Sequence, residues 1–340
     1  MSALTHEVDL GQFSPLSVEQ LYYLVRFISD RPDHERGHRH LASRGDTPPL
    51  DELARYINSR CPDTEAVEPG DLVGPWKATA VLESSPVAKY SFWCQLFPDP
   101  WFTFMNYGYQ DGRSASSSGR LTGDEELWSH AVALYDQAVP VDLRGRDAVE
   151  IGCGRGGGAA FLARTRHPLR YLGLDRARSN ILFCRERHSR DNLAFAPGLA
   201  TDIPLHDESC DVIVNVESAP YYHPIEAFAR SAARVLRRGG HVCLATYGPE
   251  EDVWHLRDAF LDAGLALAEC VEITANVREA LASQDRGRAV LARVETSRSR
   301  AIYEREFASI YDPDHLNDAV YVRFVFSRPD GRLPLGKEIS

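Results

Sequence analysis

The 340-residue sequence predicts an α/β protein whose second half forms a doubly wound, mostly parallel sheet. Two observations support this fold class. Short apolar runs alternate with helical patterns of roughly 10 to 15 residues, which is the order of strands and helices in a parallel sheet. A glycine-rich turn also follows the first of these runs, at the point where the chain passes from a strand into a helix.

The expected strands are short and apolar. The run 211–216 is almost wholly apolar, as is typical of a strand that helices cover on both faces. The expected strands comprise residues 148–151, 171–174, 193–196, 211–216, 241–246, 265–273 and 319–327. We expect the last of them to close the sheet at its carboxyl end.

Helical patterns fill the spaces between these strands. The expected helices comprise residues 158–166, 178–188, 225–236 and 252–263. A turn at Gly239-Gly240 leads into the strand 241–246. Two further helices, over about 276–295 and 298–310, interrupt the alternation before the closing strand.

The first 140 residues follow a less regular pattern. Short amphipathic runs at 18–28 and 50–57 are followed by an aromatic cluster, a Gly/Ser-rich stretch at 112–119 and a helix at 122–137. The length corresponds to about two domains. We therefore predict a mainly helical N-terminal extension or lid over 1–140 and a ligand-binding domain over 141–340.

Composition narrows the class of protein. Apolar residues make up 44% and charged residues 26%, as in an ordinary globular domain. Acidic residues outnumber basic ones by 49 to 38, and this net charge of −11 argues against a nucleic-acid partner. The sequence shows no membrane span and no signal peptide. The seven cysteines include no C-x-x-C pair, so we expect a cytoplasmic protein.

We expect no metal site. His34 and His38 have the spacing of a ligand pair on one helical face, but no acidic or cysteine partner accompanies them at ligand spacing. A solvated loop explains them better.

The sharpest motif is the glycine-rich turn after the first strand. Gly152, Gly154 and Gly156 let the chain turn tightly and let a ligand approach the backbone. The helix that follows offers unpaired N–H groups at its start. Glycine turns in α/β proteins are also often only tight connections.

Two carboxylates flank this turn. Asp175 ends the second predicted strand, where an acidic side chain commonly accepts hydrogen bonds from ribose hydroxyls, although it could also cap the next helix. Glu150 immediately precedes the glycines. Two carboxylates suit a ligand that carries a ribose and a cationic amino group better than they suit a ligand that carries a pyrophosphate. The pair therefore favours S-adenosyl-L-methionine over NAD.

From residue 147 to residue 244 the chain resembles the class I S-adenosylmethionine-dependent methyltransferases. The resemblance rests on Glu150–Gly156, on Leu174-Asp175, on the approach to strand four at 207–213 and on the helix and turn at 233–240. It implies a Rossmann-like, seven-stranded sheet. A more specific resemblance, through residues 104–109, 156–158 and 215–218, is to the phthiotriolone dimycocerosate methyltransferase-like group of actinobacterial lipid and polyketide enzymes.

This resemblance implies further cofactor contacts. Tyr107 or Tyr109 would cap the methionine end, and Asn215 would contact the cofactor after strand four. Related proteins carry an Asp that receives the adenine amino group, but Leu199 stands at that position here. The Ala200 N–H can still reach the adenine, with Thr201 or Asp202 as substitutes. Leu199 is therefore compatible with two alternatives: a site that binds the cofactor more weakly, or a protein that uses the methyltransferase fold for another purpose.

Two residues are candidates for catalysis. Glu217 follows a buried strand, where apolar surroundings would make a carboxylate a stronger base, and His223 lies in the next loop. Their alternative roles are loop stabilisation for Glu217 and surface or capping contacts for His223.

The aromatic extension favours a small, largely apolar acceptor, although these aromatics could equally pack a helical core. We predict methyl transfer to a hydroxyl group of a natural product in secondary metabolism. The alternatives are C-methylation of a terpenoid or polyketide with Glu217 as base or cation stabiliser, and a non-methylating enzyme or binding protein. The N-terminal extension would determine which substrate binds, or it would form the interface of a homodimer.

Overall fold

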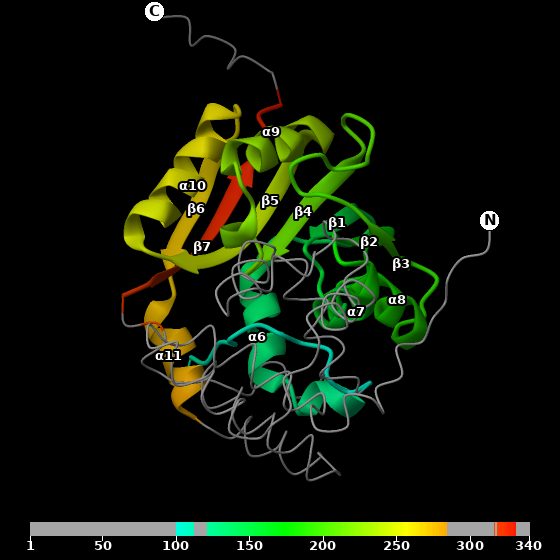
Figure 1. Ribbon diagram of the computed structural model, residues 1–340. Coiled ribbons are helices and arrows are strands. Elements are labelled where there is room, and N and C mark those ends of the chain that lie inside the picture. The colour runs from blue at the N-terminus through cyan, green and yellow to red at the C-terminus, as the bar shows by residue number, and fades with distance from the viewer. Residues whose placement is uncertain (1–99, 112–120, 284–315, 317, 331–340) are drawn as a thin grey trace, which may run out of the picture. The chain divides into compact units, whose positions relative to one another are not determined.

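The computed structural model describes residues 100–111, 121–283, 316 and 318–330 (Figure 1). Most of the predicted N-terminal extension, the predicted helix 298–310 and the end of the predicted helix 276–295 lie outside these residues, as do His34 and His38. No helix in the described ranges is both long and apolar enough to cross a membrane.

Seven strands form one sheet, which confirms the predicted fold class. The strands are β1 (Asp147–Ile151), β2 (Arg170–Asp175), β3 (Leu193–Pro197), β4 (Cys210–Val216), β5 (Leu236–Gly248), β6 (Ala266–Glu272) and β7 (Val320–Ser327). Their order across the sheet is β3-β2-β1-β4-β5-β7-β6. All pairings are parallel except those of β7, which runs antiparallel to both β5 and β6.

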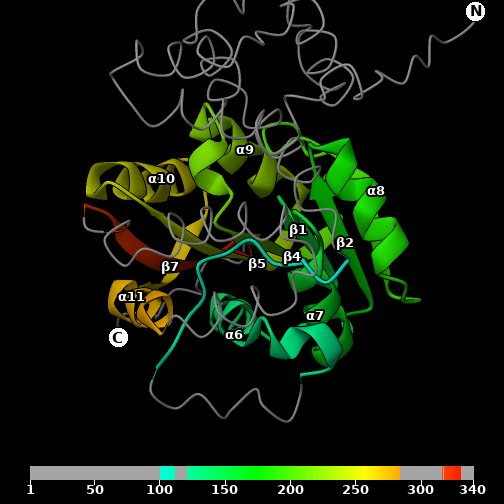
Figure 2. The same ribbon diagram turned by 60° about the horizontal axis from the view of Figure 1, so that its bottom comes forward.

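Helices cover both faces of this sheet. The helical elements are η2 (Gly123–Glu126), α6 (Ser129–Ala138), α7 (Gly157–Thr165), α8 (Arg178–Arg187), η3 (Ala219–Tyr221), α9 (Ile225–Val235), α10 (Glu250–Asp262) and α11 (Thr274–Ala282). Helices α9 and α10 lie on one face, and α6, α7 and α11 lie on the other (Figure 2). Helix α8 packs against β2 and β3 at the edge of the sheet.

The core between the sheet and α9–α10 is built from aromatic contacts. Phe228 on α9 is fully buried and meets Phe260 edge-to-face, with ring centroids 5.4 Å apart. Phe260 in turn stacks on Phe326 of β7 at 4.9 Å. These contacts join α9, which connects β4 to β5, to α10 and to the last strand, so the carboxyl-terminal half of the sheet and its helices share one core.

Three elements differ from their predicted form. The expected helix 122–137 is divided into η2 and α6, because the chain makes a separate turn capped by Thr122 and Glu125 before Trp128. Strand β5 begins at Leu236 rather than residue 241 and runs through Gly239-Gly240, where the backbone pairs with Arg328. Finally, β7 lies between β5 and β6 and not at an edge, so β6 is the outermost strand.

We predict that Phe228→Ala lowers the free energy of unfolding by about 3 to 5 kcal/mol, because the cavity left between α9 and α10 cannot collapse fully. Leu182→Ala is the control: Leu182 is 60% exposed on α8, and its truncation is expected to cost less than about 0.5 kcal/mol. Urea unfolding followed by circular dichroism measures both. Equal losses in the two variants would contradict the assigned core.

Candidate functional site

The candidate residues gather at the carboxyl-terminal edge of the parallel strands. The glycine turn follows β1, Asp175 ends β2, and Glu217 follows β4. Because β7 is antiparallel, its first residues reach the same edge beside the end of β5. In open α/β sheets this edge is where ligands bind.

The turn after β1 adopts a backbone that favours glycine. Gly152, Gly154 and Gly156 have φ angles of +74°, +53° and +76°. At Gly152 an added Cβ would also lie 2.3 Å from the Ser218 hydroxyl and 2.4 Å from the Tyr222 hydroxyl. The chain thus turns tightly on these glycines, as predicted, and the turn is packed directly against the loop that follows β4.

Asp175 connects this turn to the start of α8. Its Oδ2 accepts a hydrogen bond from the Gly154 N–H at 2.8 Å, and its Oδ1 accepts one from the Ala177 N–H at 2.8 Å. Burial raises the pKa of Asp175, although these backbone donors and the Asn180 side chain act in the opposite direction. Asp175 therefore ties the glycine turn to Ala177, the N-cap residue of α8, but it does not cap the helix itself. A carboxylate has about four acceptor positions, so capacity remains for a ligand hydroxyl.

Glu150 lies beneath the turn in a fully buried position. Its two oxygens accept hydrogen bonds from the hydroxyls of Tyr135 on α6, at 2.7 Å, and Tyr171 on β2, at 2.9 Å. Burial raises the pKa of Glu150 to about 7, although the two tyrosine donors oppose this shift. The carboxylate thus ties α6, β1 and β2 together, and any cofactor contact would be additional to this role.

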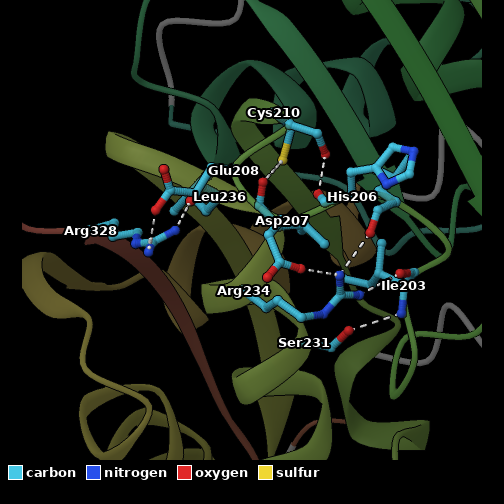
Figure 3. A network of polar contacts seen from close by, with 12 residues as sticks. Ile203, His206, Asp207, Glu208, Cys210, Ser231, Arg234, Leu236 and Arg328 are labelled. Carbon is cyan, nitrogen blue, oxygen red and sulfur yellow. Dashed lines mark hydrogen bonds and ion pairs between the residues drawn. The ribbon is translucent and has the colours of Figure 1, made fainter.

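The loop after β3 carries the residues predicted near the adenine. Leu199 is 51% exposed, whereas Ala200 is buried. The loop is fixed from α9: the Arg234 guanidinium donates to the carbonyl oxygens of Ile203 and Leu205, at 2.7 Å each, and contacts Asp207 (Figure 3). The apolar Leu199 side chain therefore projects from a loop whose backbone is held in place.

Asn215 is a structural link between two strands. It is fully buried, and its amide nitrogen donates to the Ile151 carbonyl at 2.9 Å and to the Ser218 hydroxyl at 2.8 Å. Its amide oxygen accepts from the Ala219 N–H at 3.2 Å. Asn215 thus holds the end of β1 against the loop after β4.

Glu217 is surrounded by tyrosines. Its Oε1 accepts hydrogen bonds from the Tyr107 backbone N–H and from the Tyr321 hydroxyl, both at 2.8 Å. The hydroxyl of Tyr247 lies 3.4 Å from that of Tyr107 and 3.3 Å from that of Tyr221. A carboxylate and several phenol groups therefore meet beyond the ends of β4 and β5.

The remaining two predicted residues lie differently. The backbone N–H of Tyr109 donates to the His130 carbonyl on α6 at 2.9 Å, while Tyr107 joins the group around Glu217. Burial and the nearby Asp111 raise the pKa of Tyr109. His223 is exposed. Within the described ranges, no group of three His, Cys, Asp or Glu side chains could hold a metal ion.

Four tyrosines were not singled out from the sequence. Tyr135 and Tyr171 hold Glu150, whereas Tyr247 and Tyr321 form a directly opposed pair of β5 and β7 beside Glu217. The sequence signal that points to Tyr247 and Tyr321 is their position near the ends of predicted strands. The pairing of β7 with β5, which brings them together, is not visible in the sequence.

Comparisons with known proteins agree with this geometry. A family described as "Methyltransferase domain" matches residues 149–244. The chain is 35% identical to a fatty-acid O-methyltransferase of Mycolicibacterium smegmatis, over 55% of this chain and 68% of that protein. It is 33% identical to a phthiotriol/phenolphthiotriol dimycocerosates methyltransferase of Mycobacterium leprae, over 53% of this chain and 66% of that protein. These matches cover about half of this chain.

The fold also matches solved structures. The [4+2]-cyclase SpnF aligns with a TM-score of 0.54 at 18% identity, over 70% of this chain and 94% of that one. A putative sarcosine dimethylglycine methyltransferase from Galdieria sulphuraria aligns with a TM-score of 0.50 at 14% identity, over 71% of this chain and 98% of that one. At these identities the likeness concerns the fold.

We predict a pH-dependent contribution of Glu150 to stability. Because its pKa is about 7 in the folded state against 4.5 normally, the folded state binds the extra proton between these values. Stability is therefore favoured at low pH and lost as the pH rises from about 4.5 through 7, by about 3 kcal/mol in total.

Urea unfolding of wild type and Glu150→Gln at a series of pH values between 5 and 8 tests this assignment. The glutamine side chain cannot ionise, so the difference in unfolding free energy between the two proteins should change in favour of the variant as the pH rises. Parallel pH dependences would show that Glu150 does not titrate in this range.

Proposed function

The chain belongs to the family of S-adenosyl-L-methionine-dependent methyltransferases that includes these mycobacterial enzymes, and from this premise we propose that it methylates a hydroxyl group of a small, largely apolar natural product. The observation that carries the proposal is the position of Glu217. Its carboxylate is held by two hydrogen bonds at the same sheet edge as the glycine turn and Asp175.

The residues at this edge fit the cofactor. The glycine turn carries no side chain at Gly152, Gly154 and Gly156, although the N–H groups of these glycines already donate to protein oxygens. Asp175 retains acceptor capacity for a ribose hydroxyl. When bound, S-adenosyl-L-methionine supplies a methyl group activated by a positively charged sulfur. The full set of proposed cofactor contacts is Tyr107, Tyr109, Glu150, Gly152, Gly154, Gly156, Asp175, Leu199, Ala200 and Asn215.

Glu217 is the proposed general base. A hydroxyl group attacks a methyl carbon more readily when a base removes its proton, and alignment supplies much of the remaining rate. The hydrogen bonds from Tyr107 and Tyr321 fix the direction of the carboxylate, which lets it receive that proton without reorganisation. His223 is the alternative base, but its exposed position gives it no comparable support.

The nature of the acceptor is inferred from two observations. Relatives are named for a fatty acid and for phthiotriol dimycocerosates, which are lipids. The net charge of −11 disfavours a nucleic-acid acceptor. Carbon methylation with Glu217 as base or cation stabiliser is the second candidate, because phenol rings around a carboxylate also suit a developing positive charge.

We predict that Asp175→Asn weakens S-adenosyl-L-methionine binding about 10- to 100-fold, because a neutral amide replaces a charged acceptor. The asparagine side chain preserves the shape and one oxygen that can accept from a backbone N–H group. Asp191→Asn, at an exposed turn before β3, is the matched control and should bind normally. Isothermal titration measures all three proteins; absence of binding to the wild type would rule out the cofactor site.

We predict that Glu217→Gln lowers methyl transfer at least about 100-fold, the usual contribution of a general base. Its cofactor affinity should stay near the wild-type value. Long-chain alcohols and phenols serve as acceptor probes, with product mass to detect the added methyl and NMR to distinguish O-methyl from C-methyl products. Normal turnover by the variant would refute the role of Glu217, and a C-methyl product would favour the second candidate.

A further inference from the structure

The backbone of Glu217 is strained. Its φ angle of +59° lies in the left-handed region, which is unfavourable for a residue with a side chain. The conformation is held by the hydrogen bond from the Glu217 N–H to the Ala245 carbonyl, at 2.8 Å. Strain of this kind persists where surrounding contacts determine the geometry, and it is concentrated at functional sites.

The side chain is held from two further directions. The Tyr107 N–H comes from the segment that precedes α6, and the Tyr321 hydroxyl comes from the start of β7. Both donate to the same atom, Oε1. A carboxylate that accepts two hydrogen bonds from different elements is held in a defined orientation.

Tyr321 is held in place by several contacts of its own. Its side chain is fully buried, and its ring stacks on Tyr247 with centroids 5.8 Å apart and planes inclined by 19°. Its backbone N–H donates to the Thr274 hydroxyl at 2.9 Å. Burial and the neighbouring Glu217 raise the pKa of Tyr321, so its hydroxyl keeps the proton that it donates.

We propose that Tyr321 is a positioning residue for methyl transfer, whose hydroxyl aims the Glu217 carboxylate at the acceptor. The inference rests on the proposed function, in which Glu217 is the base. It adds a residue of β7, far from the glycine turn in sequence, to the machinery of the reaction. The role belongs to the hydroxyl group, because the ring alone would suffice for packing on Tyr247.

Other titratable groups also face Glu217. Tyr107 supplies its backbone N–H, and Tyr135 of α6 is near enough for the Glu217 charge to contribute to its raised pKa, after burial and Glu150. Since Tyr107 acts on Glu217 through its main chain and Tyr135 donates to Glu150, removal of the Tyr321 hydroxyl isolates one support of Glu217.

The experiment compares Tyr321→Phe with wild type, using long-chain alcohols as acceptor probes. We expect kcat to fall about tenfold, the effect of one hydrogen bond to a charged group, with KM nearly unchanged. The acid limb of the pH–rate profile should move to higher pH, because a carboxylate that loses a hydrogen-bond donor has a higher pKa. An unchanged limb would overturn the proposal.

Tyr171→Phe is the matched control for a lost phenol hydroxyl. It removes a comparable buried donor, at 2.9 Å from Glu150, and should leave the titration of Glu217, followed by carboxyl ¹³C NMR, unchanged. Replacement of Tyr321 by 3,5-difluorotyrosine keeps the ring and hydroxyl but strengthens the donor, so the limb should move to lower pH. This variant tests the proposal even if Tyr321→Phe folds poorly. A difluorotyrosine protein with an unmoved limb would count against it.

Two further measurements separate this inference from the proposed function. In a Glu217→Gln background, Tyr321→Phe should cause no additional loss of kcat, whereas an independent structural role would multiply the losses. A carboxyl ¹³C NMR titration, assigned with Glu217→Gln, follows Glu217 without any acceptor. If wild type methylates none of the probes, the proposed function fails, and an unshifted Glu217 titration in Tyr321→Phe separately overturns the positioning role.

Discussion

Close packing around the turn after β1 is the constraint on which the site depends. A Cβ atom at Gly158 would lie 1.9 Å from the ring of Tyr135, and one at Gly152 would meet the loop after β4. Helix α6, the turn and the β4 loop can therefore assemble at these distances only because the side chains are missing. Because these elements lie so close together, the Tyr135 hydroxyl donates a hydrogen bond to Glu150, and the Asn215 side chain donates one to Ile151 at the end of β1.

The carboxylates at this edge are held by neutral donors. Tyrosine hydroxyls donate to Glu150, and backbone N–H groups donate to Asp175. Among the described residues, the Tyr107 N–H and the Tyr321 hydroxyl donate to Glu217. Neutral donors fix an acidic side chain without cancelling its charge, whereas an arginine partner would neutralise it. Where these carboxylates are ionised the edge is electronegative, which suits a cofactor that carries a positive sulfur and an amino group.

The sequence predicted the strands well because each is a local apolar run, and it placed the glycine turn and Asp175 because both belong to one short βα unit. The expectations that needed long-range pairing were incomplete. The position of β7 depends on antiparallel pairing with two strands, and the contact of Tyr321 with Glu217 depends on that position. The division of the helix before Trp128 follows from the turn capped by Thr122 and Glu125, a local signal that the helical pattern 122–137 concealed, and the indole of Trp128 is fully buried where α6 begins.

The internal position of β7 also sets the order in which this domain can be completed on the ribosome. The other six strands emerge first, yet β6 has no neighbour in the sheet until β7 has been synthesised and inserted between it and β5. Domains generally fold as units once their chain is available. Since β7 also carries Tyr321, the nascent protein acquires the last support of Glu217 in the same step that closes its sheet.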